Sequence, residues 1–210
     1  MESETGAPEL ATKRETNRLR TRHKISQSSR RLFTTHGFKA TTIDQIAEEA
    51  GLSRRTFFRY FSTKEAVVFS ENEGRLDSFI AMLEKETDPH HLFSGLDACV
   101  LLMARIFESA KADQLLQHRL IASAPALQAY ELRIDFLWEQ RLAQTWLKQL
   151  GDDASDESVL HVRAAAGAAM GMIRAVLHHW YEGECRGDLI AYATEGLARF
   201  HSGQNFQPTP

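Results

Sequence analysis

The sequence predicts an all-α protein with two domains, a short basic one at the N-terminus and a longer acidic one behind it. Three observations support this prediction. Apolar residues recur at helical spacing, and no segment alternates convincingly between apolar and polar side chains as a strand does. Two short amphipathic segments flank a glycine turn within residues 41–61. Charge changes sign along the chain: residues 10–64 hold 13 basic and 4 acidic side chains, whereas residues 65–210 hold 12 and 21.

A long first helix is expected over residues 13–36. Ile25, Leu32 and Phe33 lie on one face of it, and Gly37 follows its end, where a left-handed residue commonly stops a helix. This helix supplies the apolar face against which the next two short helices can pack.

Between residues 41 and 61 the chain reads TTIDQIAEEAGLSRRTFFRYF, which indicates two short helices joined by a tight turn. Thr41 or Thr42 can cap the first of them, and Ser53 can cap the second. Gly51 supplies the permissive backbone that the turn between them needs. The buried face of the first helix is expected to comprise Ile43, Ile46, Ala47 and Ala50.

The second short helix has an inner and an outer face. Phe57 and Phe61, one turn apart, fix it to the core. The side chains left on its other faces are Arg54, Arg55, Thr56, Phe58 and Tyr60. A helix-turn-helix presents such a set to the major groove, where arginine binds guanine O6 and N7 and threonine or aromatic carbons pack on the thymine methyl. The pattern predicts a DNA-binding head.

The charge distribution agrees with this interpretation. Residues 10–64 carry a net charge of +9, although the whole chain carries only -3. A basic head concentrates phosphate attraction at one end, and the acidic remainder discourages other contact with the duplex. The alternative is an ordinary solvated charge run with no partner.

Cysteine usage and hydropathy indicate a soluble cytoplasmic protein. Cys99 and Cys185 show no CxxC or framework spacing, which favours two reduced, packed thiols. The longest weakly polar run, residues 164–177, contains Arg174 and is too short to span a bilayer. The N-terminus lacks the charged and then apolar pattern of a signal peptide.

The remaining elements are all expected to be helices. Ser62 and Glu65 form a predicted capping box that opens a fourth helix, and Asp88 with Pro89 stops it after Glu86. Five more helices are expected at about 91–109, 112–122, 124–150, 156–182 and 188–201. The expected divisions are a disordered tail at 1–10, a DNA-binding domain at 11–62, a ligand-binding and dimerisation domain at 63–201 that begins with a connecting helix at 63–86, and a disordered tail at 202–210.

The string LFTTHGFKATTIDQIAEEAGLSRRTFFRYFSTKEAVV, residues 32–68, resembles the TetR family of bacterial transcriptional regulators. The resemblance implies a homodimeric repressor of a palindromic operator, released from DNA by a small molecule. It also implies that Thr42 and Lys64 contact phosphates. The DNA-binding set is then Thr42, Ser53, Arg54, Arg55, Thr56, Phe58, Tyr60 and Lys64.

Two positions depart from the family's usual pattern. Arg55 stands where a small residue is common, and Phe58 stands where a tyrosine is common. Phe58 therefore cannot donate a hydrogen bond to a phosphate. Arg55 can add either a base contact or a further phosphate contact.

The second half resembles regulators of the mycofactocin type, through HRLIA at 118–122, APAL at 124–127 and a long helix with Trp138 and Trp146. Known members of that group respond to long-chain acyl-CoA, so the resemblance implies an acyl-CoA-like or other small lipophilic effector. Candidates for a pocket among the helices are Met103, Phe107, His118, Arg119, Tyr130, Trp138, Met170 and Arg174.

A homodimer interface is expected on the last two long helices. Gly167 and Gly171, within AAAGAAMGM, allow another helix to approach closely. The alternative is packing within one chain only. Candidate interface residues are Gly167, Gly171, Ile173, Leu177, Trp180 and Leu197.

The sequence offers little for catalysis or for a metal. His178, Glu182 and Cys185 recur at helical spacing, but no fourth ligand follows at a recognisable distance. Neither GxSxG, GxxxxGK, HExxH nor a dinucleotide glycine fingerprint is present. We therefore predict no metal, no cofactor and no enzymatic activity. The alternative function is a helical small-molecule binding protein or enzyme that retains a degenerate DNA-binding head.

Overall fold

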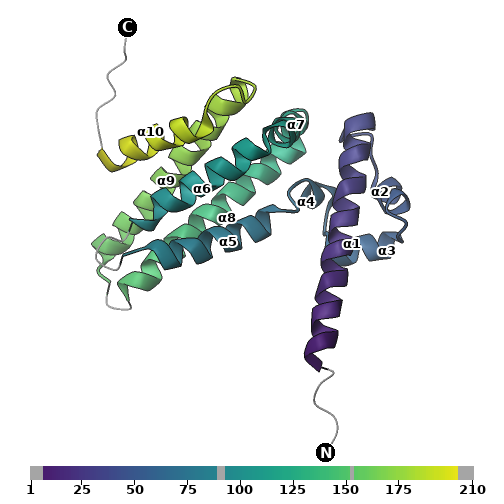
Figure 1. Cartoon of the computed structure of the whole chain (residues 1–210), viewed down its shortest axis with the longest axis horizontal. Helices are drawn as coiled ribbons and strands as arrows, with labels where there is room; N and C mark the ends of the chain where they lie inside the picture. The colour runs from purple at the N-terminus through teal and green to yellow at the C-terminus, as the bar shows by residue number, and fades with distance from the viewer. Residues whose placement is uncertain (1–6, 89–92, 152–153, 203–210) are drawn as a thin grey trace, which may run out of the picture. The chain divides into compact units, whose positions relative to one another are not determined.

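The computed structural model describes residues 7–88, 93–151 and 154–202 of the chain (Figure 1). These residues form ten helices and no strand, which confirms the all-α prediction. The helices are α1 (Ala7–His36), α2 (Ile43–Glu49), α3 (Arg54–Tyr60), α4 (Lys64–Val68), α5 (Asn72–Glu86), α6 (Gly95–Ser109), α7 (Lys111–Ala122), α8 (Pro125–Leu150), α9 (Asp156–Glu182) and α10 (Leu189–Ser202). Most of the predicted tails, at 1–6 and 203–210, lies outside the described residues.

The chain divides into two compact units. The first extends to Glu71 and includes residues 120–130, which span the end of α7 and the start of α8; the second comprises residues 72–119 and the chain from Glu131 onwards. The first unit thus holds more of the chain than the predicted domain of residues 11–62.

The first unit packs α2, α3 and α4 around α1. Ile25 on α1, Ile46 on α2 and Phe57 on α3 are fully buried. The rings of Phe33 and Phe38 lie 5.2 Å apart on either side of the turn after α1. Gly37 ends α1 with a φ of +80°, in the left-handed region that favours glycine, as the sequence predicts.

The predicted single helix over residues 63–86 is wrong, because the chain breaks between α4 and α5. Phe69 at the break is buried and stacks on Tyr130, with 5.2 Å between ring centroids. Two side chains of α1 bind the next residue: Arg22 donates to the Ser70 carbonyl at 2.9 Å, and Ser26 shares a hydroxyl hydrogen bond with Ser70. These contacts hold the backbone outside helical geometry.

The start of α4 also differs from the prediction. Thr63, and not Ser62, is the N-cap, and its hydroxyl accepts a hydrogen bond from the Ala66 N–H at 3.2 Å. A side-chain hydroxyl therefore caps the helix as predicted, but it belongs to the next residue along the chain.

The second unit buries a large apolar core among α5, α6, α8, α9 and α10. Trp146 and Trp180 are its largest fully buried side chains, and the Trp180 indole donates to the Gly187 carbonyl at 3.0 Å. Gly196 on α10 lies close to Met172 and Val176 on α9, so a side chain at this position would collide with α9. The five helices predicted in this part of the chain are confirmed, with ends shifted by at most a few residues.

Among the described residues, α9 alone is long and apolar enough to cross a membrane by length and composition. Only 22% of its most apolar window is buried within the chain. Single helices of this kind are weak evidence for a membrane span. A mostly uncovered apolar helix also suits a contact with a second protein chain.

Candidate functional site

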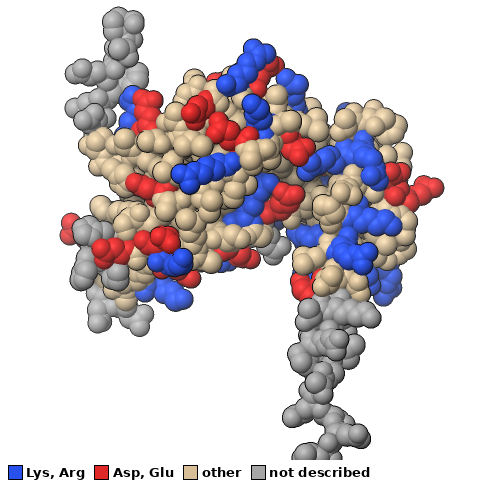
Figure 2. Space-filling model, viewed as in Figure 1, with Lys and Arg blue, Asp and Glu red and all other residues tan. Residues whose placement is uncertain are grey.

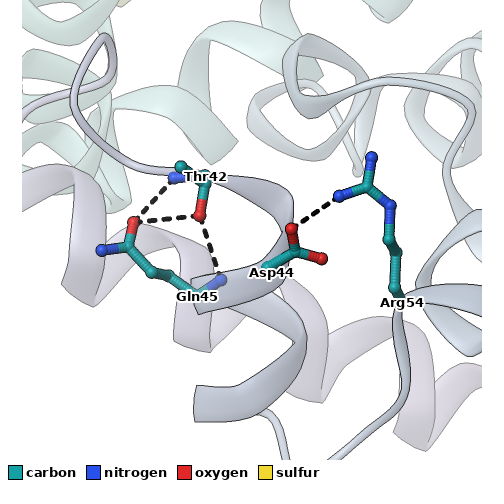
Figure 3. Close-up of polar contacts among 4 residues, drawn as sticks. All are labelled: Thr42, Asp44, Gln45 and Arg54. Carbon is teal, nitrogen blue, oxygen red and sulfur yellow. Dashed lines mark hydrogen bonds and ion pairs between the residues drawn. The ribbon is translucent and has the colours of Figure 1, made fainter.

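The N-terminus of α2 is held by a reciprocal cap. The Thr42 hydroxyl accepts from the Gln45 N–H at 3.2 Å, and the Gln45 side-chain oxygen accepts from the Thr42 N–H at 2.8 Å (Figure 3). Of the two candidate threonines, Thr42 is therefore the cap. Thr41 is buried and donates to the Gly37 carbonyl at 2.8 Å.

The turn and the second short helix have the geometry of a helix-turn-helix. Gly51 adopts a φ of +62°, and the Ser53 hydroxyl caps α3 by accepting from the Thr56 N–H at 3.1 Å. Phe57 is fully buried and Phe61 is 3% exposed, so both anchor α3 to the core. The cap and the two buried rings fix the orientation of a helix only seven residues long.

Arg54, at the first position of α3, forms an ion pair with Asp44 of α2 at 2.6 Å (Figure 3). Its guanidinium also lies 5.4 Å from the centroid of the Phe58 ring. Both ion-pair partners are more than half exposed, and such pairs contribute only about 0–1 kcal/mol. The pair therefore orients Arg54 in the absence of DNA without preventing it from rearranging on a base.

The neighbouring Arg55 is exposed and has no hydrogen bond or ion pair within the described chain. Its guanidinium is thus available to a ligand with all of its donors. Figure 2 shows Lys and Arg side chains gathered on the first unit, with few acidic ones among them. Thr56 shares a hydroxyl hydrogen bond with Ser53 at 2.9 Å, and Phe58 and Tyr60 keep part of their surface exposed.

Lys64 has a structural role that the sequence analysis missed. Its ammonium donates to the carbonyls of Phe38 at 2.6 Å and Thr41 at 2.7 Å, and it lies 4.2 Å from the centroid of the Phe38 ring. Burial lowers the pKa of Lys64. An ammonium has three donors, so one remains for a phosphate, and that contact stays a prediction.

In the second unit the candidate pocket residues occupy different environments. Met170 is buried, and Met103, Phe107 and Trp138 pack against the core. The two arginines are exposed and paired: Arg119 with Glu184 at 2.8 Å, and Arg174 with Asp135 at 3.4 Å. Tyr130, also predicted to line the pocket, does not lie in the second unit. It belongs to the first unit, where it stacks on Phe69.

His118 is part of a polar cluster that includes side chains the sequence analysis overlooked. Its ring stacks on Tyr181 at 4.4 Å, and the Tyr181 hydroxyl bonds the buried Gln114 amide oxygen at 3.2 Å. Burial raises the pKa of Tyr181 and of both Glu131 and Asp135. Glu131 and Asp135 lie one turn apart on α8, a spacing that the sequence already shows, but the burial of both carboxylates follows only from the packing.

Glu131 has no hydrogen bond or ion pair in the part of the chain that the structure describes, so no partner compensates its charge and its raised pKa can be tested through stability. Its raised pKa means that the folded chain takes up a proton before the unfolded chain does, so this carboxylate destabilises the fold at pH 7. The penalty falls as pH drops through the raised pKa towards the ordinary value of 4.5. Glu131→Gln should raise the unfolding midpoint at pH 7, because the amide carries no charge that has to be buried.

Thermal unfolding followed by circular dichroism at pH 7 and pH 5 checks this result, and the gain should be smaller at pH 5. Glu84→Gln is the matched control, because Glu84 is an exposed carboxylate of the same unit and its loss should leave the unfolding midpoint close to that of the wild type. An equal midpoint for Glu131→Gln and the wild type at pH 7 would contradict the argument.

The candidate dimer residues divide into two groups. Trp180 and Leu197 are 1% and 3% exposed within one chain, so they pack in its own core and present almost no surface to a partner. Gly167 lies beside Glu139 of α8, whereas a side chain at Gly171 would meet open space. Ile173 and Leu177 are partly buried against the core. No group of three or more His, Cys, Asp or Glu side chains in the described residues is arranged to hold a metal.

The first unit therefore has the features of a DNA-reading head: a capped and anchored second helix, an exposed arginine pair and a basic surface. The rest of the chain forms a second all-helical unit with its own core. Together they define a helix-turn-helix transcriptional regulator with a separate C-terminal domain.

Comparisons with known proteins identify the family. Residues 25–70 match the model of bacterial regulatory proteins of the tetR family, and residues 91–205 match the MftR C-terminal domain. The chain belongs to the TetR family, with a C-terminal domain of the MftR type. The predictions of a ligand-responsive regulator, of operator DNA as its partner and of a homodimer agree with this membership.

Three relatives illustrate the match. The mycofactocin biosynthesis transcriptional regulator MftR of Mycobacterium tuberculosis is 28% identical over 167 residues, which cover 80% of this chain and 83% of MftR. The HTH-type transcriptional regulator TcmR of Streptomyces glaucescens is 33% identical over 168 residues, 77% of this chain and 74% of TcmR. The structure of the TetR-family repressor FadR of Thermus thermophilus with lauroyl-CoA covers 90% of this chain and 97% of FadR, with a TM-score of 0.54 and 21% identity.

Proposed function

We propose that this protein is a cytoplasmic, non-enzymatic repressor that binds a palindromic operator as a homodimer and leaves it when an acyl-CoA-like or other lipophilic effector binds. One observation carries the DNA-binding part: a short helix fixed by Ser53, Phe57 and Phe61 that begins with two exposed arginines. The relatives MftR and TcmR, both regulators, support the absence of enzymatic activity and a cytoplasmic location.

The effector is proposed to bind in the second unit. Support comes from the MftR-type domain and from the likeness in fold to FadR, whose structure contains lauroyl-CoA. Met103, Phe107, Trp138 and Met170 supply apolar surface for an acyl chain. Arg119 or Arg174, both exposed, would meet an acidic head group after release from its present carboxylate.

The proposed dimer contact lies on the uncovered side of α9. Leu160 is 69% exposed, Ala168 and Ala175 are exposed, and Gly171 faces open space. Small side chains let two helices approach closely, and a second copy of α9 would cover this apolar surface.

Selection of bound duplexes from a random-sequence pool tests the DNA-binding proposal. We expect a palindromic consensus and a complex of two chains per duplex. Addition of acyl-CoA esters of graded chain length should then release the selected duplex, and a lipophilic cation serves as a comparison ligand. Failure to enrich any sequence at low ionic strength would overturn the proposed function, whereas release by the cation alone would overturn only the effector class.

A pair of variants separates base reading from general attraction. Arg54→Ala should cost about 1–3 kcal/mol on the selected duplex and little on a scrambled one, since a bidentate contact to guanine discriminates between bases. Asp44→Ala is the companion variant, because it removes the partner of Arg54 and leaves the guanidinium in place. Titrations of both duplexes at constant salt provide the measurement. Equal losses on the two duplexes would exclude Arg54 from base reading.

A further inference from the structure

We propose that α1 supplies two DNA-phosphate contacts, one beyond each end of the recognition helix α3. Arg18 acts with Arg59 and Tyr60 at the C-terminal end of α3, and Lys24 acts near the turn at the N-terminal end of α3. This inference rests on the proposed function and adds residues of a different helix to the DNA-binding surface. It follows from how α1 lies against the helix-turn-helix within the first unit.

At the C-terminal end of α3, one face of α1 meets Tyr60 and Phe61. The Arg22 guanidinium lies 4.8 Å from the centroid of the Phe61 ring, and its Nη2 donates to the Ser70 carbonyl. Thr21, on the same face of α1, is close enough to Tyr60 to affect the pKa of its hydroxyl, although its own hydroxyl donates to the Asn17 carbonyl. These contacts fix which face of α1 is turned towards the end of the recognition helix.

Arg18 lies on that same face, one helical turn before Thr21 and Arg22. Arg59 approaches Tyr60 from α3, with Nη2 at 3.4 Å from the hydroxyl and the guanidinium 5.1 Å from the ring centroid. Thr21 and then the charges of Arg59 and Arg18 lower the pKa of Tyr60, against the effect of burial. The Arg59 guanidinium therefore lies at the phenolic hydroxyl, and Arg18 is near enough for its charge to act on the same group.

This arrangement suits a phosphate group. Arginine binds phosphate oxygens through its fork of N–H donors, and a tyrosine hydroxyl is a common further donor to the DNA backbone. Among the described residues, Arg18 pairs with Glu15 alone, at 3.8 Å, and both side chains are more than half exposed, so the pair is a weak competitor. The ion pair can therefore give way to a phosphate at little cost.

At the other end of α3, Lys24 of α1 lies over the turn. Its Nζ is 3.5 Å from where a side chain on Gly51 would begin, and the side chain is exposed, with no hydrogen bond or ion pair in the described chain. Seven residues of α3 span about 10 Å, close to the width of about 12 Å of the major groove. Charges beyond both ends of α3 can thus reach the phosphates that border the groove.

The salt dependence of operator binding tests the inference. Each phosphate contact contributes about 0.9 to the slope of log K against log salt, so Arg18→Ala should reduce the slope by about 1.8 in a dimer with one contact per half-site. When salt rises from 50 to 200 mM, the affinity of both proteins falls, and the factor by which it falls should be about 12 times smaller for the variant than for the wild type. Lys24→Ala should behave in the same way, and Arg18→Lys should restore most of the slope.

Arg105→Ala is the matched control, because Arg105 is an exposed arginine of the second unit and its removal changes the charge equally. Its slope should equal that of the wild type. If the wild type binds its selected duplex and Arg18→Ala and Lys24→Ala have the slope of Arg105→Ala, this inference is overturned and the proposed function stands. If the wild type binds no duplex, both are overturned.

Discussion

Phe57→Ala is expected to abolish operator binding by unfolding the DNA-binding head. Phe57 is fully buried at the centre of the first unit, with its ring 5.9 Å from that of Phe61. Truncation of a buried phenylalanine to alanine typically costs about 3–5 kcal/mol, through lost burial and the cavity left behind. A domain of this small size has little stability beyond that amount.

Circular dichroism, limited proteolysis and a DNA titration measure the effect of this variant. We expect early cleavage within the first unit and no binding at micromolar protein. Size-exclusion chromatography should still give the dimer, since the second unit has its own core.

The adjacent residue provides the control. Phe58 is 44% exposed and touches Phe57 edge to face at 5.6 Å, so Phe58→Ala should cost no more than about 1 kcal/mol of stability. Its effect on DNA binding then reports contact with the groove and not folding. A Phe57→Ala protein that melts at the wild-type temperature would show that this ring does not hold α3 in place.

The contrast between Phe57 and Phe58 shows what the sequence could predict. Helix faces follow from spacing, so the buried and exposed sides of α3 were readable. The Ser53 cap and the Gly51 turn were readable for the same reason, because both depend on residues within a few positions of one another. Local rules predicted the helix-turn-helix almost completely.

The break between α4 and α5 depends on distant contacts and was not predictable in this way. The residues that hold it, Arg22, Ser26 and Tyr130, lie more than 40 positions away from Ser70 or Phe69. The string from residue 63 to 86 contains no proline, and Ser70, Asn72 and Gly74 weaken a helix after Phe69 without requiring it to stop there. Tertiary contacts overrode a pattern that locally favours one continuous helix.

The dimer residues show a second limit. Apolar spacing on α9 and α10 indicates burial, but it does not say whether the covering surface belongs to the same chain or to a second copy. Trp180 and Leu197 are covered by their own chain, whereas Leu160 and Gly171 are not. Which apolar residues are covered by their own chain is decided by the packing of α10 across α9 and α6.

Lys64 is the third case, and it supplies the second large prediction. Lys64→Ala is expected to destabilise the first unit by about 2–4 kcal/mol in the absence of any DNA. The variant leaves the carbonyls of Phe38 and Thr41 without their donor, and each unsatisfied buried acceptor costs about 1–3 kcal/mol. It also removes the cation from the Phe38 ring.

Lys64→Met separates the two contributions of the side chain. Methionine keeps an apolar stem against Phe38 but cannot donate, so a loss of stability close to that of Lys64→Ala would assign the effect to the ammonium. Lys39→Ala is the matched control, since Lys39 is exposed and has no hydrogen bond or ion pair in the described chain. Urea unfolding of the DNA-free proteins gives the free energies.

The two roles of Lys64 make different predictions for DNA binding. If its third donor reaches a phosphate, the salt slope of the folded Lys64→Met protein should fall as it does for a lost backbone contact. If the residue acts only by joining α4 to the turn before α2, the slope stays at the wild-type value and affinity falls in proportion to the fraction unfolded. If both Lys64 variants are as stable as the wild type, the structural role is refuted. That result would mean that water can replace the ammonium as the donor to the two carbonyls.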